Sequence, residues 1–145
     1  MSWLFEVMYK ISRVIPGFNK FMGMIYSCDI PRKAHIGKNV RLFHNALGVV
    51  INKNAVIGDN VTIYHHVTIG NNKVSGEAPT IGDNVTLGSY AMVLGKISIG
   101  ENTVIGAGSI VMHDVPANCT YYNKREEVCI GLDDKNRQTA ALKQK

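Results

Sequence analysis

The chain has 145 residues, of which 46% are hydrophobic and 19% charged, so one folded domain is expected and an intrinsically disordered chain is not. No apolar run reaches the ~18–20 residues of a membrane-spanning helix, and three cysteines without a C-x-x-C pair argue against a disulfide framework or a cysteine zinc site. The net charge of +5 suits a polyanionic ligand or an acidic surface, whereas the absence of a basic run argues against nucleic-acid binding. We expect a cytoplasmic protein with reduced thiols.

Residues 1–28 are predicted to form an N-terminal helical segment. Apolar residues at helical spacing run from Trp3 to Ile15, Pro16 ends this helix, and a second apolar stretch covers residues 18–26. The first helix either packs across the end of the following domain or on a neighbouring subunit, or makes a peripheral membrane contact through residues 3–15. The chain start lacks the basic region and the cleavage site of a signal peptide.

Ile36 and Leu42 are six residues apart, and so are Ile51 and Ile57, but the two pairs do not agree in phase. The register therefore slips between residues 43 and 50, a segment that contains a histidine. Slips of this kind in a repeat often mark function.

A six-residue repeat occupies residues 57–110. Written in sixes from residue 57, eight of nine blocks begin with an aliphatic residue, and Ser75 is the exception. A period of six fits neither an α-helix nor an alternating strand, but it is typical of a β-helix of stacked hexapeptide turns. Aliphatic residues would point inward, while glycine and Asp-Asn or Glu-Asn pairs would form the corners. These nine blocks predict about three coils, within a domain spanning residues 29–118 and followed by a closing segment and polar tail at 119–145.

Residues 28–120 resemble the hexapeptide-repeat acyltransferases, in particular their serine acetyltransferase-like branch. Asp29 precedes His44 by fifteen residues, as a similar aspartate precedes the catalytic histidine of serine acetyltransferases. APTIGDNVTLGSYAMVLG, IGENTVIGAGSIV and DVPANC also resemble family segments. The resemblance implies an all-β fold, a left-handed parallel β-helix, with acetyl-CoA as co-substrate, a homotrimer, and active sites between subunits.

The acceptor expected from this resemblance is a sugar or polysaccharide precursor. Phe43 stands where serine-specific enzymes have an aspartate, and Glu77-Ala78 stands where they carry an arginine-histidine pair ahead of a proline. The segment HNALGVVIN is more similar to sugar and polysaccharide O-acetyltransferases of the same superfamily. Serine O-acetyltransferase activity and a non-catalytic trimeric scaffold are the alternatives.

Acyl transfer to a hydroxyl needs a base, because an alcohol is a weak nucleophile at neutral pH. Histidine titrates near neutrality, so His44 is predicted to be the general base. Asp29 is predicted to accept the other ring N–H and hold the imidazole in one tautomer.

Further side chains are predicted around this pair. His65 and His66 either contact the substrate at a subunit interface or form a structural corner, and their adjacent positions do not suit a metal site. Residues 71–79 are expected to form a mobile loop on the acceptor side. Phe43 and Asn45 complete the predicted substrate contacts. The predicted coenzyme contacts are Ser89, Ala107 and Gly108 for the arm, and Lys96, His113, Lys124 and Arg125 for the phosphates.

Overall fold

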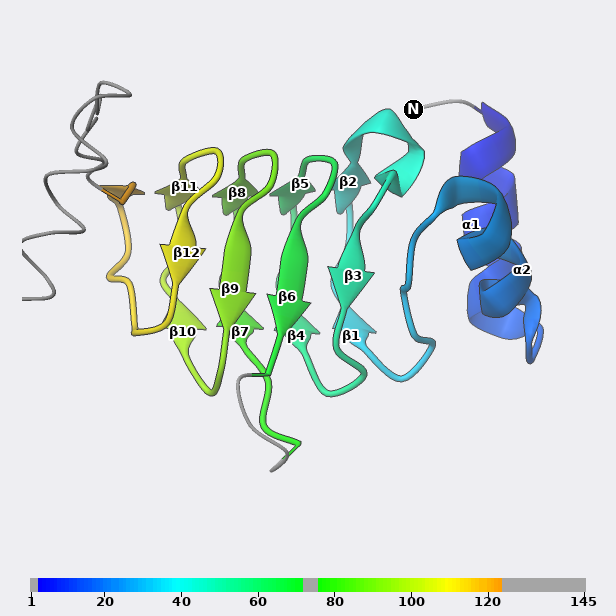
Figure 1. The fold of residues 1–145 in the computed structure, drawn as a ribbon, viewed down its shortest axis with the longest axis horizontal. Coiled ribbons are helices and arrows are strands. Elements are labelled where there is room, and N and C mark those ends of the chain that lie inside the picture. Colours follow the sequence, from blue (N-terminus) through cyan, green and yellow to red (C-terminus); the bar gives the residue numbers. More distant parts are fainter. Residues whose placement is uncertain (1–2, 72–75, 124–145) are drawn as a thin grey trace, which may run out of the picture.

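The computed structural model describes residues 3–71 and 76–123 of the chain. Two helices, α1 and α2, precede a series of very short strands, and a single 3-10 turn, η1, interrupts that series (Figure 1). Their bounds are α1 Trp3–Val14, α2 Phe18–Tyr26, β1 His35–Ile36, β2 Arg41–Leu42, η1 Phe43–Ala46, β3 Val50–Ile51, β4 Val56–Ile57, β5 Thr62–Ile63, β6 Thr68–Gly70, β7 Thr80–Ile81, β8 Thr86–Leu87, β9 Met92–Leu94, β10 Ser98–Ile99, β11 Val104–Ile105, β12 Ile110–Val111 and β13 Thr120–Tyr121.

The strands form three parallel sheets that are the three faces of a coil. Their orders are β1-β4-β7-β10, β2-β5-β8-β11-β13 and β3-β6-β9-β12, so each strand pairs with strands one coil before and after it. Successive coils stack along one axis (Figure 1). The predicted fold, a left-handed parallel β-helix of hexapeptide repeats with an N-terminal helical segment, is confirmed.

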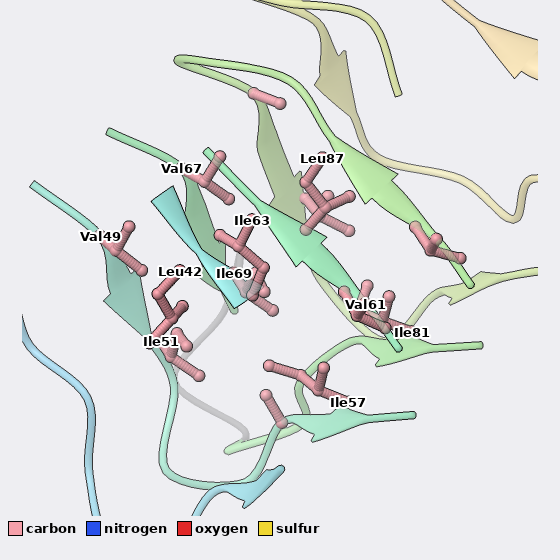
Figure 2. Close-up of a cluster of buried hydrophobic side chains, with 14 of the residues drawn as sticks. Leu42, Val49, Ile51, Ile57, Val61, Ile63, Val67, Ile69, Ile81 and Leu87 are labelled. Atoms are coloured by element: carbon pink, nitrogen blue, oxygen red, sulfur yellow. The ribbon is translucent and has the colours of Figure 1, made fainter. Parts of the chain in front are cut away.

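The core is a column of aliphatic side chains inside the coils. Ile57, Ile63 and Ile69 are almost completely buried and point into the space that the three sheets enclose (Figure 2). Residues at the fifth hexad position, such as Val61 and Val67, are buried beside them. Because each coil is open above and below, burial of these side chains requires a neighbouring coil, as the repeat predicts.

One corner of the coils is built by a ladder of asparagines. Asn39, Asn60, Asn84, Asn102 and Asn118 occupy equivalent positions after the first strand of successive coils, and all have left-handed backbone angles with φ between 54° and 60°. Their side-chain amides are linked at 3.2 Å between Asn39 and Asn60, and at 3.1 Å in the pairs Asn84–Asn102 and Asn102–Asn118. Asparagine tolerates this conformation better than most residues, which confirms the predicted role of the Asp-Asn and Glu-Asn pairs. We call this row the asparagine corner.

The regular six-residue count conceals an insertion. Ile57 pairs with Ile81, 24 residues later, whereas Ile81 pairs with Ile99 after 18 residues. The chain between β6 and β7 therefore holds six residues more than a regular coil, and the predicted series of nine consecutive hexads is one too long. Because the surplus equals one hexad, it leaves the period of the sequence unchanged.

The helices close one end of the β-helix. Phe5 of α1 and Met22 of α2 are buried in the same core as Cys28 and Ile30, and the Arg13 guanidinium donates hydrogen bonds to the Pro31 and Ala34 carbonyls at 2.9 and 2.8 Å. Burial raises the pKa of the Cys28 thiol, and the nearby Asp29 carboxylate adds to this effect. In the part of the chain that the structure describes, no helix is long and apolar enough to cross a membrane.

Candidate active site

His44 lies in a turn that adds three residues to the first coil. Ile36 pairs with Ile57 after 21 residues, but Ile51 pairs with Ile69 after 18, so the surplus stands between β2 and β3. This confirms the register slip predicted over residues 43–50. The extra residues form η1, which projects from a corner of the β-helix in Figure 1.

The backbone of this turn is strained. His44, Asn45 and Ala46 are consecutive left-handed residues with φ of 52°, 55° and 58°. For Ala46, whose side chain cannot compensate, this conformation is less stable than an ordinary one by about 1–2 kcal/mol, whereas histidine and asparagine tolerate it better. The turn is held by the Val49 N–H, which donates to the Ala46 carbonyl at 2.9 Å, and by the Gly48 N–H, which donates to the Ser27 carbonyl at 3.0 Å. Strain of this kind is typical of functional sites.

Aromatic and imidazole rings from successive coils meet at this corner. The ring of Phe43 stacks on that of Tyr64, with centroids 4.7 Å apart and 9° between the planes. The ring of His44 meets that of His65 edge to face at 4.8 Å. We call the corner that these rings occupy, which also includes two further stacked rings, the histidine corner: Phe43, His44, Tyr64, His65, His66 and Tyr90.

His65 links the predicted base to the next coil. Its Nδ1 lies 3.3 Å from the Ser89 Oγ, within hydrogen-bond distance, while its ring faces His44. The structure therefore brings together His44, His65 and Ser89, which the sequence assigned to three different roles. His66 stacks on the ring of Tyr90 at 4.6 Å and 12°.

Gly48 makes room for this arrangement. It has a φ of +68°, and a Cβ at this position would overlap the ring of His66. The next coils place His66 and Tyr90 in the left-handed corner position with φ of 57° and 61°, where the other corner uses asparagine. Sequence reasoning missed Gly48, Tyr64 and Tyr90. The two tyrosines could have been found from the sequence, because they stand at corner positions that such a repeat usually fills with small or turn-forming residues.

Asp29 lies on the segment before the first coil. Its backbone pairs with β3, because its N–H donates to the Val49 carbonyl and its carbonyl accepts from the Ile51 N–H, both at 2.8 Å. Its side chain is exposed and makes no hydrogen bond to His44 in the described part of the chain. The pairing of Asp29 with His44 stays a prediction.

The predicted coenzyme contacts fall on two corners. Ala107 lies one coil after Ser89 at the histidine corner, and Gly108 takes the left-handed position of Tyr90, with a φ of 66°. The Gly108 N–H donates to the Ser89 carbonyl at 2.8 Å. Lys96 and His113 instead follow β9 and β12, at the corner between the third and first sheets. The remaining two, Lys124 and Arg125, lie outside the described residues.

Lys96 is paired with an acid at its corner. Its Nζ lies 2.9 Å from Glu77 Oε1, and this hydrogen bond, with the attraction of the carboxylate, raises the pKa of the lysine. Glu77 belongs to the predicted acceptor-side loop, residues 71–79, and it lies at a different corner of this chain from His44. Among the described residues, no group of three or more His, Cys, Asp or Glu side chains could hold a metal ion.

Residues 78–113 match the family described as bacterial transferase hexapeptide (six repeats). Serine acetyltransferase 5 of Arabidopsis thaliana is 52% identical over 46 residues, which are 32% of this chain and 14% of that protein. "Putative colanic acid biosynthesis acetyltransferase WcaB" of Escherichia coli is 48% identical over 46 residues, 32% of this chain and 28% of that protein.

The fold resembles solved structures over a longer stretch. Serine acetyltransferase of Neisseria gonorrhoeae in complex with serine superposes with a TM-score of 0.70 at 38% identity, over 77% of this chain and 46% of that one. The chain thus spans less than half the length of these relatives.

Proposed function

We propose that this chain, a hexapeptide-repeat protein whose β-helix is shared with serine acetyltransferases, is an O-acetyltransferase that transfers the acetyl group of acetyl-CoA to a hydroxyl. The observation that carries the proposal is the strained turn that presents His44 beside His65 and Ser89. The 38% identity to a serine acetyltransferase structure supports the same activity.

His44 is assigned as the general base. An imidazole that titrates near neutrality can accept the proton of the acceptor hydroxyl while the oxygen attacks the thioester carbon. The imidazolium then donates this proton to the sulfur of the leaving thiolate, so the base is restored in each turnover. General acid–base catalysis of this kind contributes about 10²–10⁴-fold to the rate. No covalent acyl-enzyme is required.

The other residues of the corner are assigned to positioning and binding. His65 contacts His44 edge to face and reaches Ser89, so it can hold the base in place. Ser89, Ala107 and Gly108 offer small side chains along successive coils, where the extended arm of the coenzyme could bond to backbone groups. We expect a homotrimer in which a neighbouring copy completes the site, and a sedimentation experiment checks this.

Serine is the acceptor that the relatives favour, since the neighbouring structure was solved in complex with serine. A sugar or polysaccharide hydroxyl is the second candidate, and two observations favour it. Phe43 stacks on Tyr64 directly before His44, so the base is flanked by a flat apolar surface of the kind that packs against sugar rings. The colanic acid relative, 48% identical over 46 residues, points the same way.

The test is release of coenzyme A from acetyl-CoA, followed by chromatography because the three cysteines of the chain would react with a thiol dye. Acceptors are L-serine and a panel of sugars and nucleotide sugars. We expect His44→Ala to lower turnover by at least about 100-fold. His35→Ala, which removes an exposed histidine of β1, is the matched control and should leave turnover unchanged.

Each outcome decides between the candidates. His44-dependent turnover with serine supports the first acceptor, and turnover with a sugar alone supports the second. Full activity of His44→Ala would contradict the assignment of the base. Absence of both turnover and acetyl-CoA binding would favour a non-catalytic scaffold.

A further inference from the structure

The helical end of the molecule exposes large apolar side chains. Val14 and Met24 are 73% and 76% exposed, the highest values among the large apolar residues that the structure describes on α1 and α2. Four further apolar side chains, three on these helices and Ile15 directly after α1, are about half exposed. We call the whole set the apolar end face: Leu4, Val14, Ile15, Phe21, Met24 and Ile25.

The exposed apolar side chains lie at different helical positions from the side chains that pack against the β-helix. Phe5 of α1 and Met22 of α2 belong to the buried core that continues into the β-helix, and Ser12 of α1 is buried as well. Leu4 and Val14, and likewise Phe21 and Ile25, fall at other helical positions and remain exposed. The helices form the end of the molecule opposite β13 (Figure 1). Each helix is therefore apolar on a side that the described residues leave uncovered.

Positive charge is concentrated at the same end. Residues 1–34 contain five Lys or Arg and two Asp or Glu, whereas residues 35–123 contain five of each. Lys10 lines a shallow depression together with Ile11, Val14 and Ile15. The Arg32 guanidinium donates to the Val14 carbonyl at 2.9 Å, which places a cation at the edge of the apolar end face. Lys20 and Lys33 are exposed on the same segment.

From this coincidence of exposed apolar side chains and positive charge, we propose that the apolar end face docks on the surface of an anionic lipid bilayer. Apolar side chains would enter the boundary between headgroups and acyl chains, and the surrounding cations would meet the lipid phosphates and carboxylates. The 12-residue α1 suits a helix that lies in the plane of the interface.

The positive charge also argues against a second copy of the chain as the partner that covers the apolar end face. If two copies met through this face about a two-fold axis, the cations of this end, Lys10, Lys20, Arg32 and Lys33, would be brought together, and like charges across an interface are unfavourable. An anionic membrane instead offers opposite charge to the cations and an apolar interior to the side chains. The proposal is independent of the assignment of His44.

The test is flotation of the full chain with lipid vesicles. Vesicles of phosphatidylcholine with about one third phosphatidylserine are compared with pure phosphatidylcholine, at roughly 0.05 and 0.5 M salt. We expect binding to the anionic vesicles that falls steeply at the higher salt, and little binding to the neutral ones.

Matched variants separate the apolar and charged contributions. The double variant Val14→Ser with Met24→Ser should bind at least tenfold less, while Val104→Ser with Met112→Ser, exposed apolar residues of the β-helix, should bind as the wild type does. Lys20→Gln with Lys33→Gln should also reduce binding, and Lys38→Gln with Lys53→Gln should not. All positions except Val104 lie outside strands, and thermal unfolding confirms that each variant is folded.

Flotation would overturn the proposal in two ways: wild-type protein that does not float with anionic vesicles, or an end-face variant that floats as well as the wild type. A third contradicting result is a lower molecular mass of Val14→Ser with Met24→Ser than of the wild type in sedimentation, which would make the face a contact between copies. His44→Ala should float normally, so a failure of the catalytic proposal would be seen separately.

Discussion

The asparagine corner and the histidine corner solve the same backbone problem with different residues. Both turn the chain through a left-handed position in successive coils. At the first, five asparagines fill this position and several bond to one another along the axis. At the second, His66 and Tyr90 fill it, although the tyrosine side chain is poorly suited to that conformation. One corner therefore suits the backbone conformation, whereas the other carries side chains that we propose for catalysis and binding.

The largest effect is expected from Gly48→Ala. Its methyl would overlap the ring of His66 and would also occupy a left-handed position. We expect a loss of about 2–3 kcal/mol in the free energy of unfolding, measured by chemical denaturation, together with lower turnover. Gly17→Ala is the control, since Gly17 has a φ of +83° but nothing within 4 Å of the added Cβ. Equal losses in both variants would contradict the close approach of His66.

A smaller effect is expected when the asparagine ladder is interrupted. Asn84→Ala removes the hydrogen bond that the Asn84 side-chain amide donates to Asn102 Oδ1 at 3.1 Å, and it puts alanine, which tolerates the left-handed conformation less well than asparagine, at a φ of 57°. The free energy of unfolding should fall by about 1–2 kcal/mol while turnover stays unchanged. Asn84→Gly, which tolerates the backbone angle, should lose less, and a loss of activity in either variant would argue against a purely structural role for this corner.

The smallest effect is expected from a substitution at the histidine corner that stabilises the fold instead of destabilising it. Tyr90→Asn should raise the free energy of unfolding by about 0.5 kcal/mol, because asparagine suits the left-handed position better than tyrosine. The gain is small because the stack on His66 is lost. Turnover should fall if this ring supports the site, and a variant with both higher stability and full activity would remove Tyr90 from it.

The register slip shows what can be predicted from sequence. Residues 43–50 break the period by a number that is not a multiple of six, so the irregular turn at His44 was visible. The insertion between β6 and β7 adds six residues and leaves the period unchanged, so its only signs in the sequence are Ser75 at an aliphatic position and the loop predicted over residues 71–79. For this reason the corner on which Glu77 and Lys96 lie, and the ion pair between them, could not be derived.

The alternation of aliphatic and turn-forming residues by itself determined the β-helix, its buried column and its asparagine corner, because each hexad satisfies its own local geometry and differs little from the next. Only the tertiary structure decided that Phe43 meets Tyr64, that His44 meets His65 and that His65 reaches Ser89. These contacts join residues that are 21 or 24 positions apart. The separation depends on how many residues are inserted into each coil. Stacking of the coils, which no single hexad encodes, brings the site together.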